Sequence, residues 1–166
     1  MGKVLNTFLN GSPGAVSRSI DDIIISVKNA GSADIPFGAP VFLGSGGAVP
    51  FDTSTPQAFT AFLGFAVRVA DKTLGSYPEG QFGDPPAGVW HAGDVMEVLV
   101  RGSLIAKLAA SGDQGDSIYI RKSDGRLTPV AGSSGSSVLL ENVRIRRPRD
   151  AYGVVAELIV NKRNIL

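Results

Sequence analysis

Short runs in which apolar and polar residues alternate, each closed by glycine or proline, recur along the whole chain. Alternation with a period of two is typical of strands that bury one face against a core. The 166 residues include 21 glycines and 10 prolines, spread along the chain in the way that many turns between short strands require. The apolar members of these sets are Ile23, Ile25 and Val27; Leu63, Phe65, Val67 and Val69; Met96, Val98 and Val100; Leu104, Ala106 and Leu108; and Val154, Ala156, Leu158 and Val160.

Turn signals separate several of these segments. Arg101-Gly102 stands between two alternating sets and predicts a β-hairpin with strands over 96–100 and 104–108. Gly115-Asp116 and Asp124-Gly125 predict two further turns, on either side of an apolar run at 118–120. A helix over 103–111 also fits the spacing, but the segment between its bracketing glycines is short for one.

The chain is therefore expected to be all-β, with a single β-barrel or jelly-roll-like sandwich built from seven to nine short strands. Residues 71–92 are rich in proline and glycine and predict a long loop, a feature that is commonly functional. Residues 132–137 read GSSGSS and predict a flexible loop.

Two regions are expected, an extended N-terminal arm over 1–19 and a body over 20–166. Glycine, asparagine and proline interrupt any regular period in the arm, yet Phe8, Leu9 and Val16 give it apolar anchors, with Arg18 at its end. A free tail needs no such anchors, so the arm is expected to lie on a surface. That surface belongs either to a partner or to the arm's own body.

Composition narrows the possible functions. The net charge of +1 does not favour a general polyanion binder, and the absence of cysteine excludes disulfides and thiolate metal sites. No apolar run approaches the ~20 residues of a membrane helix, and the N-terminus predicts no secretion signal. We expect no cofactor, no metal site and no membrane partner.

Catalytic signals are weak. His91 is the only histidine and follows Trp90 in the proline-rich segment, so it is interpreted as a loop residue rather than a base. The glycine-rich stretch 44–47 lacks the lysine of a phosphate-binding loop. Residues 112–116, GDQGD, lack the spacing of a calcium loop and are interpreted as a turn. We expect no enzymatic activity and no catalytic residues.

The densest charge feature comprises four arginines around Pro148. They are compatible with a solvated strand end, with an interface to acidic protein, or with a nucleic-acid patch, which the lack of interleaved aromatics disfavours. Strict alternation places Arg144 and Arg146 on one face and Arg147 on the other. The arginines are Arg144, Arg146, Arg147 and Arg149.

Tyr77, Phe82 and Trp90 fall in the predicted 71–92 loop. Exposed aromatics at such a place would anchor an interface, whereas buried ones would belong to a core. Both interpretations remain open at the level of sequence.

The order of several motifs resembles the cement, or decoration, proteins of tailed-bacteriophage capsids. Each motif is weak alone, but their order over most of the chain is more specific. The 71–92 loop and the arginine run have no counterpart among them. The matching segments are Gly14 to Arg18; Ile35 to Val41 (IPFGAPV); Phe62 to Ala66 (FLGFA); Gly93 to Gly102 (GDVMEVLVRG); Gly115 to Tyr119 (GDSIY); and Asp124 to Leu127 (DGRL).

This resemblance implies a structural protein, made in the host cytoplasm, that binds the outer capsid surface of the virion and clamps neighbouring major capsid subunits. It also implies a dimer or trimer on the shell and no catalytic residues. Another virion β-module, such as a tail or spike adaptor, is the alternative. A nucleic-acid-binding β-barrel that uses the arginines is a further one.

Overall fold

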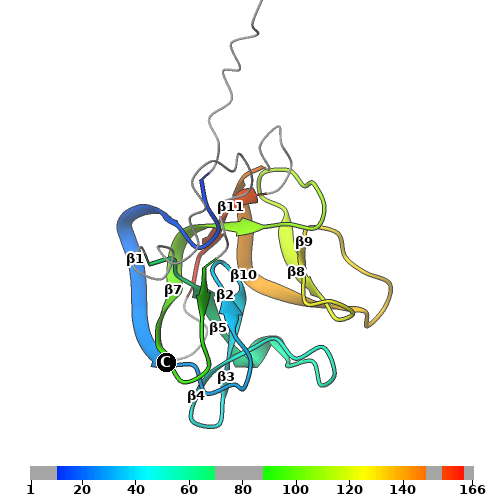
Figure 1. Ribbon diagram of the computed structural model, residues 1–166. Helices are drawn as coiled ribbons and strands as arrows, with labels where there is room; N and C mark the ends of the chain where they lie inside the picture. The colour runs from blue at the N-terminus through cyan, green and yellow to red at the C-terminus, as the bar shows by residue number, and fades with distance from the viewer. Residues whose placement is uncertain (1–10, 70–87, 149–154, 163–166) are drawn as a thin grey trace, which may run out of the picture.

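The computed structural model describes residues 11–69, 88–148 and 155–162, without the side chains of residues 18–20. Within these ranges the chain forms strands and one turn of 3-10 helix, which confirms the all-β prediction (Figure 1). The first strands are β1 (Val16–Lys28), β2 (Ile35–Pro36), β3 (Pro40–Gly44), β4 (Gly47–Pro50) and β5 (Phe62–Ala66), with the helical turn η1 (Phe59–Ala61) before β5. The later strands are β6 (Val89–Trp90), β7 (Val95–Lys107), β8 (Ser117–Arg121), β9 (Leu127–Thr128), β10 (Ser137–Arg147) and β11 (Val155–Val160).

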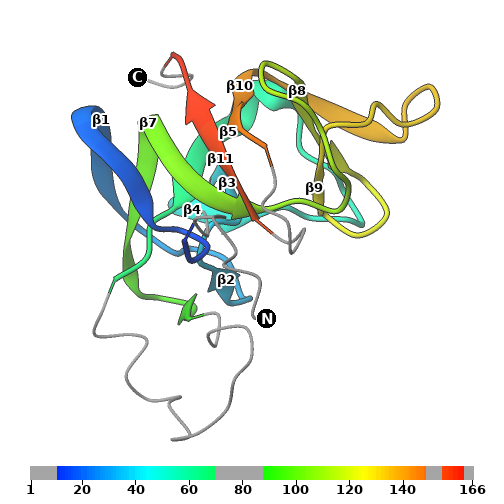
Figure 2. The ribbon, with the colours of Figure 1, turned by 90° about the horizontal axis from the view of Figure 1, so that it is seen from above.

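The strands form an open sandwich. Nine of them make one antiparallel sheet in the order β4-β3-β5-β7-β11-β10-β8-β9, with β1 also paired to β7, and β2 pairs with β6 in a small second sheet. The large sheet curves so that β8 and β9 lie apart from β3 and β4 in both views (Figures 1 and 2). Of the two predicted architectures, the sandwich is observed and the closed barrel is not.

β7 is the strand on which the large sheet is organised. Its first half pairs with β5, through Leu99 opposite Phe65, and its second half pairs with β11, through Leu104 opposite Leu158. β1 runs along the other side of both halves. The predicted hairpin at Arg101-Gly102 is therefore wrong, because residues 95–107 form one continuous strand.

Gly102 shifts the alternation of β7 where a turn was expected. Its φ of +122° is a backbone conformation that favours glycine. A Cβ there would lie 1.9 Å from Oδ1 of Asp22, so the missing side chain also lets β1 approach. Leu99 and Leu104 lie on the same side of the sheet although they are five positions apart, an odd offset that requires one residue to fall out of alternation.

Two apolar clusters cover the two faces of the central strands. Because both faces of β5 and β7 are buried, these strands are apolar nearly throughout. The first cluster comprises Phe42, Phe62, Phe65, Val67, Leu99, Leu104, Ala106, Leu108, Ile118, Ile120, Leu127, Leu140, Val143, Ile145, Ala156, Leu158 and Val160. The second comprises Ile35, Phe37, Val41, Ala48, Leu63, Ala66, Trp90, Met96, Val98 and Val100.

The cluster that a side chain joins shows which face of the sheet it occupies, so it tests the faces that alternation predicted. Met96, Val98 and Val100 share the second cluster as predicted. Leu63 lies in the second cluster and Phe65 in the first, so the prediction of one shared face is wrong there. The register of β3 with β5 shifts at this point, between Val41 and Phe42, which accounts for the change of face.

The predicted turns at 115–116 and 124–125 are confirmed. The first leads into β8, whose Ile118 and Ile120 are buried, and the second connects β8 to its antiparallel partner β9. Both turns contain a glycine with positive φ, at 92° for Gly115 and 69° for Gly125.

Part of the predicted arm packs on the body. The Gly14 N–H donates to the Ile105 carbonyl at 2.8 Å, and the Ile105 N–H donates to the Ala15 carbonyl at 2.9 Å. Gly14 is buried, and a Cβ on it would lie 2.8 Å from Cβ of Phe37. The segment from Gly14 into β1 is therefore a structural part of the body.

Candidate functional site

The arginine run ends beside a buried carboxylate. Nε of Arg146 lies 3.8 Å from Oε1 of Glu157, and Nε of Arg147 lies 4.0 Å from its Oε2. The Ser17 hydroxyl donates to Oε1 of Glu157 at 2.8 Å, and this bond joins the start of β1 to β11. Arg146 also donates from Nη1 to the Ser103 hydroxyl at 3.0 Å.

A β-bulge brings both arginines to the same carboxylate. Ile145 pairs with Leu158 and Arg147 pairs with Glu157, so β10 has one residue more than β11 between these pairs. The prediction that Arg146 and Arg147 lie on opposite faces by strict alternation is corrected by this bulge. Arg144 does not join the cluster, because its Nη1 donates to the carbonyl of Val143 at 3.2 Å.

Glu157 is only 4% exposed, and a buried carboxylate is costly unless cations and hydrogen bonds compensate it. The two arginines supply that compensation while their side chains remain 37% and 55% exposed. The guanidinium groups are thereby held in position at the surface. Such fixed, partly exposed arginines suit an interface with acidic or carbonyl-rich protein.

A polar cavity of about 290 Å³ adjoins this cluster. Oδ2 of Asp21 accepts a hydrogen bond from Nη2 of Arg101 at 2.7 Å, and Oδ1 of Asp22 accepts one from the Ser103 N–H at 3.3 Å. Oδ2 of Asp22 has no hydrogen-bond partner among the residues that the structure describes. The cavity is lined by Asp21, Asp22, Arg101, Gly102, Ser103, Arg146, Ile159, Val160 and Asn161.

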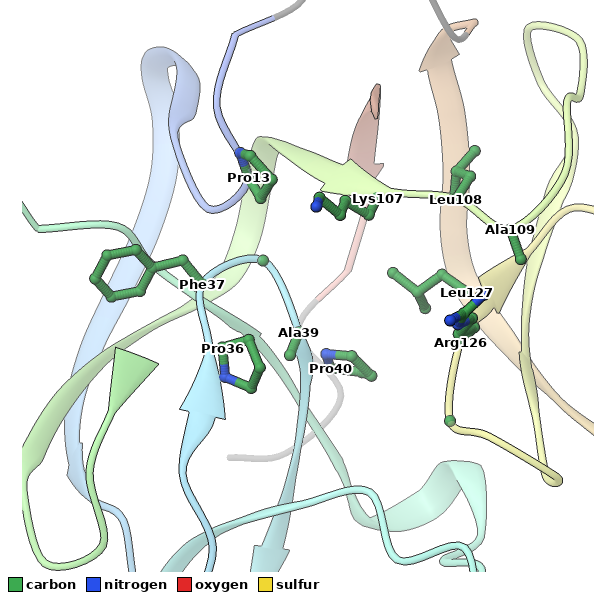
Figure 3. A pocket seen from close by; sticks show the side chains of 12 residues that line it. Pro13, Pro36, Phe37, Ala39, Pro40, Lys107, Leu108, Ala109, Arg126 and Leu127 are labelled. Carbon is green, nitrogen blue, oxygen red and sulfur yellow. The ribbon is translucent and has the colours of Figure 1, made fainter. Parts of the chain in front are cut away.

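A larger pocket of about 470 Å³ opens between the β2–β3 turn, the end of β7 and the β8–β9 turn (Figure 3). Its walls are mostly proline and aliphatic side chains, with Lys107 and Arg126 among them. A pocket of this size accepts an apolar side chain from a partner. The residues that line it are Pro13, Pro36, Phe37, Gly38, Ala39, Pro40, Lys107, Leu108, Ala109, Gly125, Arg126 and Leu127.

The other contact candidates have varied positions. Val16 is partly buried against the first cluster. Trp90 is buried in the second, where its Nε1 donates to the Val67 carbonyl at 3.0 Å and its ring meets Phe37 edge-on, so its surroundings fit the core interpretation. Arg18 pairs through its backbone with Ser103. Phe8, Leu9, Tyr77, Phe82, Arg149 and the side chain of Arg18 lie outside the described part of the chain.

His91 is an exposed loop residue, as interpreted from the sequence. Its Nδ1 lies 3.1 Å from Oδ2 of Asp34, and its backbone N–H donates to Oδ2 of Asp94 at 2.9 Å. Among the described residues, no group of three or more histidine, cysteine, aspartate or glutamate side chains is placed to hold a metal ion. In the same ranges, no helix has the length and apolar character needed to cross a membrane.

Sequence analysis missed Glu157 and its partner Ser17, and also Ser103, whose hydroxyl accepts from Arg146. One signal was available: Glu157 is the single charged residue in the run VVAELIV, and a charge inside such a run requires a partner. Which partner it takes depends on the pairing of β1, β7, β10 and β11, whose members lie far apart in the chain.

The comparisons decide the family. A family model described as "Structural cement protein (E217 gp24/Pam3 gp6)" matches residues 4–161. The chain belongs to this family of phage cement proteins. It is a structural, capsid-binding protein of the virion, as the resemblance implied.

A solved structure supports the fold of this cement protein. A chain in "The capsid of Myoviridae Phage XM1" superposes with a TM-score of 0.70 at 20% sequence identity, covering 97% of this chain and 96% of that one. At this identity the likeness shows the fold. None of the curated proteins compared matches the chain.

Proposed function

We propose that this cement protein lies on the outer capsid surface and clamps neighbouring major capsid subunits, as a dimer or trimer and without catalysing a reaction. The observation that carries the proposal is the family match over residues 4–161. Many copies on a symmetric shell add modest individual contacts into a large total stabilisation.

The arginines of β10 are the proposed capsid-contact residues of the body. Arg146 and Arg147 are anchored by Glu157 and keep part of their guanidinium surface in solvent. An acidic or carbonyl-rich patch on a capsid subunit would pair with them without ordering free side chains first, which lowers the entropic cost of binding. Arg144 and Arg149 are proposed to extend this contact surface.

Residues 1–19 are the proposed arm, with Phe8 and Leu9 as apolar anchors on a capsid subunit or on a neighbouring copy. Because Gly14 and Ala15 bond to Ile105 of the body, only the residues before them are proposed to make external contacts. A deletion of residues 1–10 therefore tests the arm while keeping every described contact of the body.

The test is a binding assay in which purified protein is added to capsid shells that lack it, followed by sedimentation and heating of the shells. We expect the wild type to co-sediment and to raise the temperature at which shells break. Deletion of residues 1–10 and the double variant Arg144→Ala plus Arg147→Ala should each weaken binding about tenfold or more.

Lys122→Ala is the control, because the Lys122 N–H bonds to Ser136 just before β10 begins, at the opposite end of that strand from Arg147. Full binding by both altered proteins would remove residues 1–10, Arg144 and Arg147 from the contact surface. Failure of the wild type to bind any shell would refute the clamp itself.

A further inference from the structure

Among the described parts of the chain, no strand pairs with the second edge of β1 over residues 16–28. β1 pairs with β7 along its length, from Val16 opposite Leu104 to Lys28 opposite Val95. Figures 1 and 2 both place β1 at the rim of the molecule, with β7 on one side only. Beyond Lys28 the edge is covered, since Asn29 bridges to Ala48 of β4 and the Ala30 N–H donates to the Ala48 carbonyl at 2.8 Å.

The open part of this edge lacks the usual protection against pairing. Proteins blunt edge strands with charges, prolines and bulges. Here the register with β7 is irregular before Ile23 and at Ile23/Ile24, but from Ile24 to Lys28 the pairing is regular. Residues 23–27 contain neither a charge nor a proline, and Ile23 and Ile24 are 37% and 41% exposed.

The segment from Asp22 to Lys28, DIIISVK, is complementary to itself when one copy runs antiparallel to another. With a two-fold axis through Ile25, Ile23 lies opposite Val27 and Ile24 opposite Ser26 of the second copy. Asp22 then lies opposite Lys28, so opposite charges meet at both ends of the pairing. A two-fold interface requires such self-complementarity, because the same patch serves on both sides.

The faces of the two copies agree in this register. Ile25 and Val27 are packed against the second cluster, whereas Ile24, Ser26 and Lys28 are exposed. Pairing about Ile25 places residues of the same parity opposite each other, so inward side chains meet inward ones. Ile23, Ile25 and Val27 of two copies would then form one continuous apolar stripe.

We propose that two copies of this protein associate through β1, pairing residues 22–28 antiparallel about a two-fold axis at Ile25 and joining their large sheets. This proposal specifies the interface of the dimer named in the proposed function. It rests on the proposed function only for the statement that copies associate. An extended segment of a capsid subunit is the competing occupant of the same edge.

The first experiment measures the mass of the isolated full-length protein by sedimentation equilibrium over roughly 1–200 µM, a range suited to a small interface. The wild type should show a dimer in equilibrium with the monomer of 17.2 kDa. Ile24→Lys combined with Ser26→Lys sets lysines opposite lysines at two places and should weaken association at least tenfold.

A matched variant introduces the same number of charged side chains at the same two positions. Ile24→Glu combined with Ser26→Lys sets a glutamate opposite a lysine at both places, so its association should equal or exceed that of the wild type. Thermal unfolding of both double variants checks the fold, since positions 24 and 26 are exposed. A monomeric wild type over the whole range, or equal association of the two variants, would overturn the proposal.

The second experiment locates the axis by disulfide trapping, which is clean because the chain has no cysteine. An equal mixture of the I24C and S26C proteins should form a cross-linked dimer on oxidation, because these positions are opposite. Either protein alone should cross-link poorly, since residues offset by two positions lie roughly 7–8 Å apart, beyond the usual disulfide span. Equal cross-linking of all three samples would contradict the axis at Ile25.

Shell binding by the Ile24→Lys plus Ser26→Lys variant distinguishes between the two candidate partners of the β1 edge, a second copy and a capsid segment. A variant that is monomeric yet binds shells nearly as well as the wild type supports pairing between copies. If the wild type is monomeric in solution and the same variant fails to bind shells, the edge belongs to a capsid segment and the proposal fails. Failure of the wild type to bind shells would refute the clamp and leave the solution dimer standing.

Discussion

Arg147 on β10 and Glu157 on β11 lie opposite each other in the sheet, with 4.0 Å between Nε of the arginine and Oε2 of the carboxylate. The bulge beside them brings Arg146 to the other carboxylate oxygen. Two cations at the surface are thus anchored by one anion beneath them. The contact surface proposed for the capsid depends on this anchor.

Glu157→Gln should lower the free energy of unfolding by about 1–3 kcal/mol, because it removes the anion from two arginines while keeping a hydrogen-bond acceptor for Ser17. This loss of stability is small for a buried ion pair because the two arginines are partly in water. Chemical denaturation measures the change. Glu141→Gln, at an exposed position on the neighbouring strand β10, should change the free energy of unfolding little, and equal effects would contradict the anchoring role of Glu157.

Gly102→Ala should destabilise the protein by about 2–4 kcal/mol, because the added Cβ would overlap Oδ1 of Asp22 and the backbone φ is positive. Gly115→Ala is the matched control. Its φ is also positive, at 92°, but nothing lies within 4 Å of the added Cβ, so the cost should be about 1 kcal/mol. Denaturation midpoints that fall equally for both would show that the contact with Asp22 is unimportant.

Asn29→Ala should cost about 2–3 kcal/mol of stability. Asn29 is fully buried, and its Nδ2 donates to the carbonyls of Ala33 and His91, at 3.1 Å each, while its Oδ1 accepts from the Gly31 N–H at 3.1 Å. Removing the amide takes this partner from the Gly31 N–H and the Ala33 carbonyl, while the His91 carbonyl keeps the bond that it accepts from the Asp94 N–H. Hydrogen exchange should accelerate at residues 30–34 and 90–94, whereas Gln114→Ala, at an exposed position, should leave these rates unchanged.

Asp124→Asn should reduce stability slightly at neutral pH and not at all in strong acid. The Arg121 guanidinium, which donates to both carboxylate oxygens, holds the pKa of Asp124 below its usual range. Stabilisation from a lowered pKa is complete above the unfolded value of about 3.9 and disappears as pH falls through the folded value.

Unfolding temperatures of wild type and D124N at pH 7 and at about pH 2 provide the measurement. Their difference should vanish at the lower pH. Ser123→Ala, in the same turn, should show no such pH dependence. A difference between wild type and D124N that persists in acid would mean that the carboxylate charge is not the cause.

The sequence predicted the strands better than their connections. Period-two alternation located β1, β11 and the two halves of β7, and an Asp-Gly turn located the β8–β9 hairpin, because both signals are local. The hairpin expected at Arg101-Gly102 failed because glycine serves equally well in a turn, a bulge or a close approach, and here Asp22, from eighty residues earlier in the chain, decides which.

The candidate site was predicted only in part. The arginines were visible as a run, but strict alternation separated Arg146 from Arg147, and a bulge depends on how two strands meet. Glu157 and Ser17 come together through long-range pairing, which no window of the sequence contains. Phe8, Leu9, Tyr77, Phe82 and Arg149 remain predictions.

The continuity of β7 has a mechanical consequence for a protein that is bound to a capsid shell. With no joint between the half that meets β5 and the half that meets β11, tension applied at opposite ends of the body runs along one backbone. Because β5 and β11 pair with different halves of β7, we expect such tension to load both pairings along the strands, in shear. β7 is therefore the element through which we expect a load to pass from one half of the body to the other.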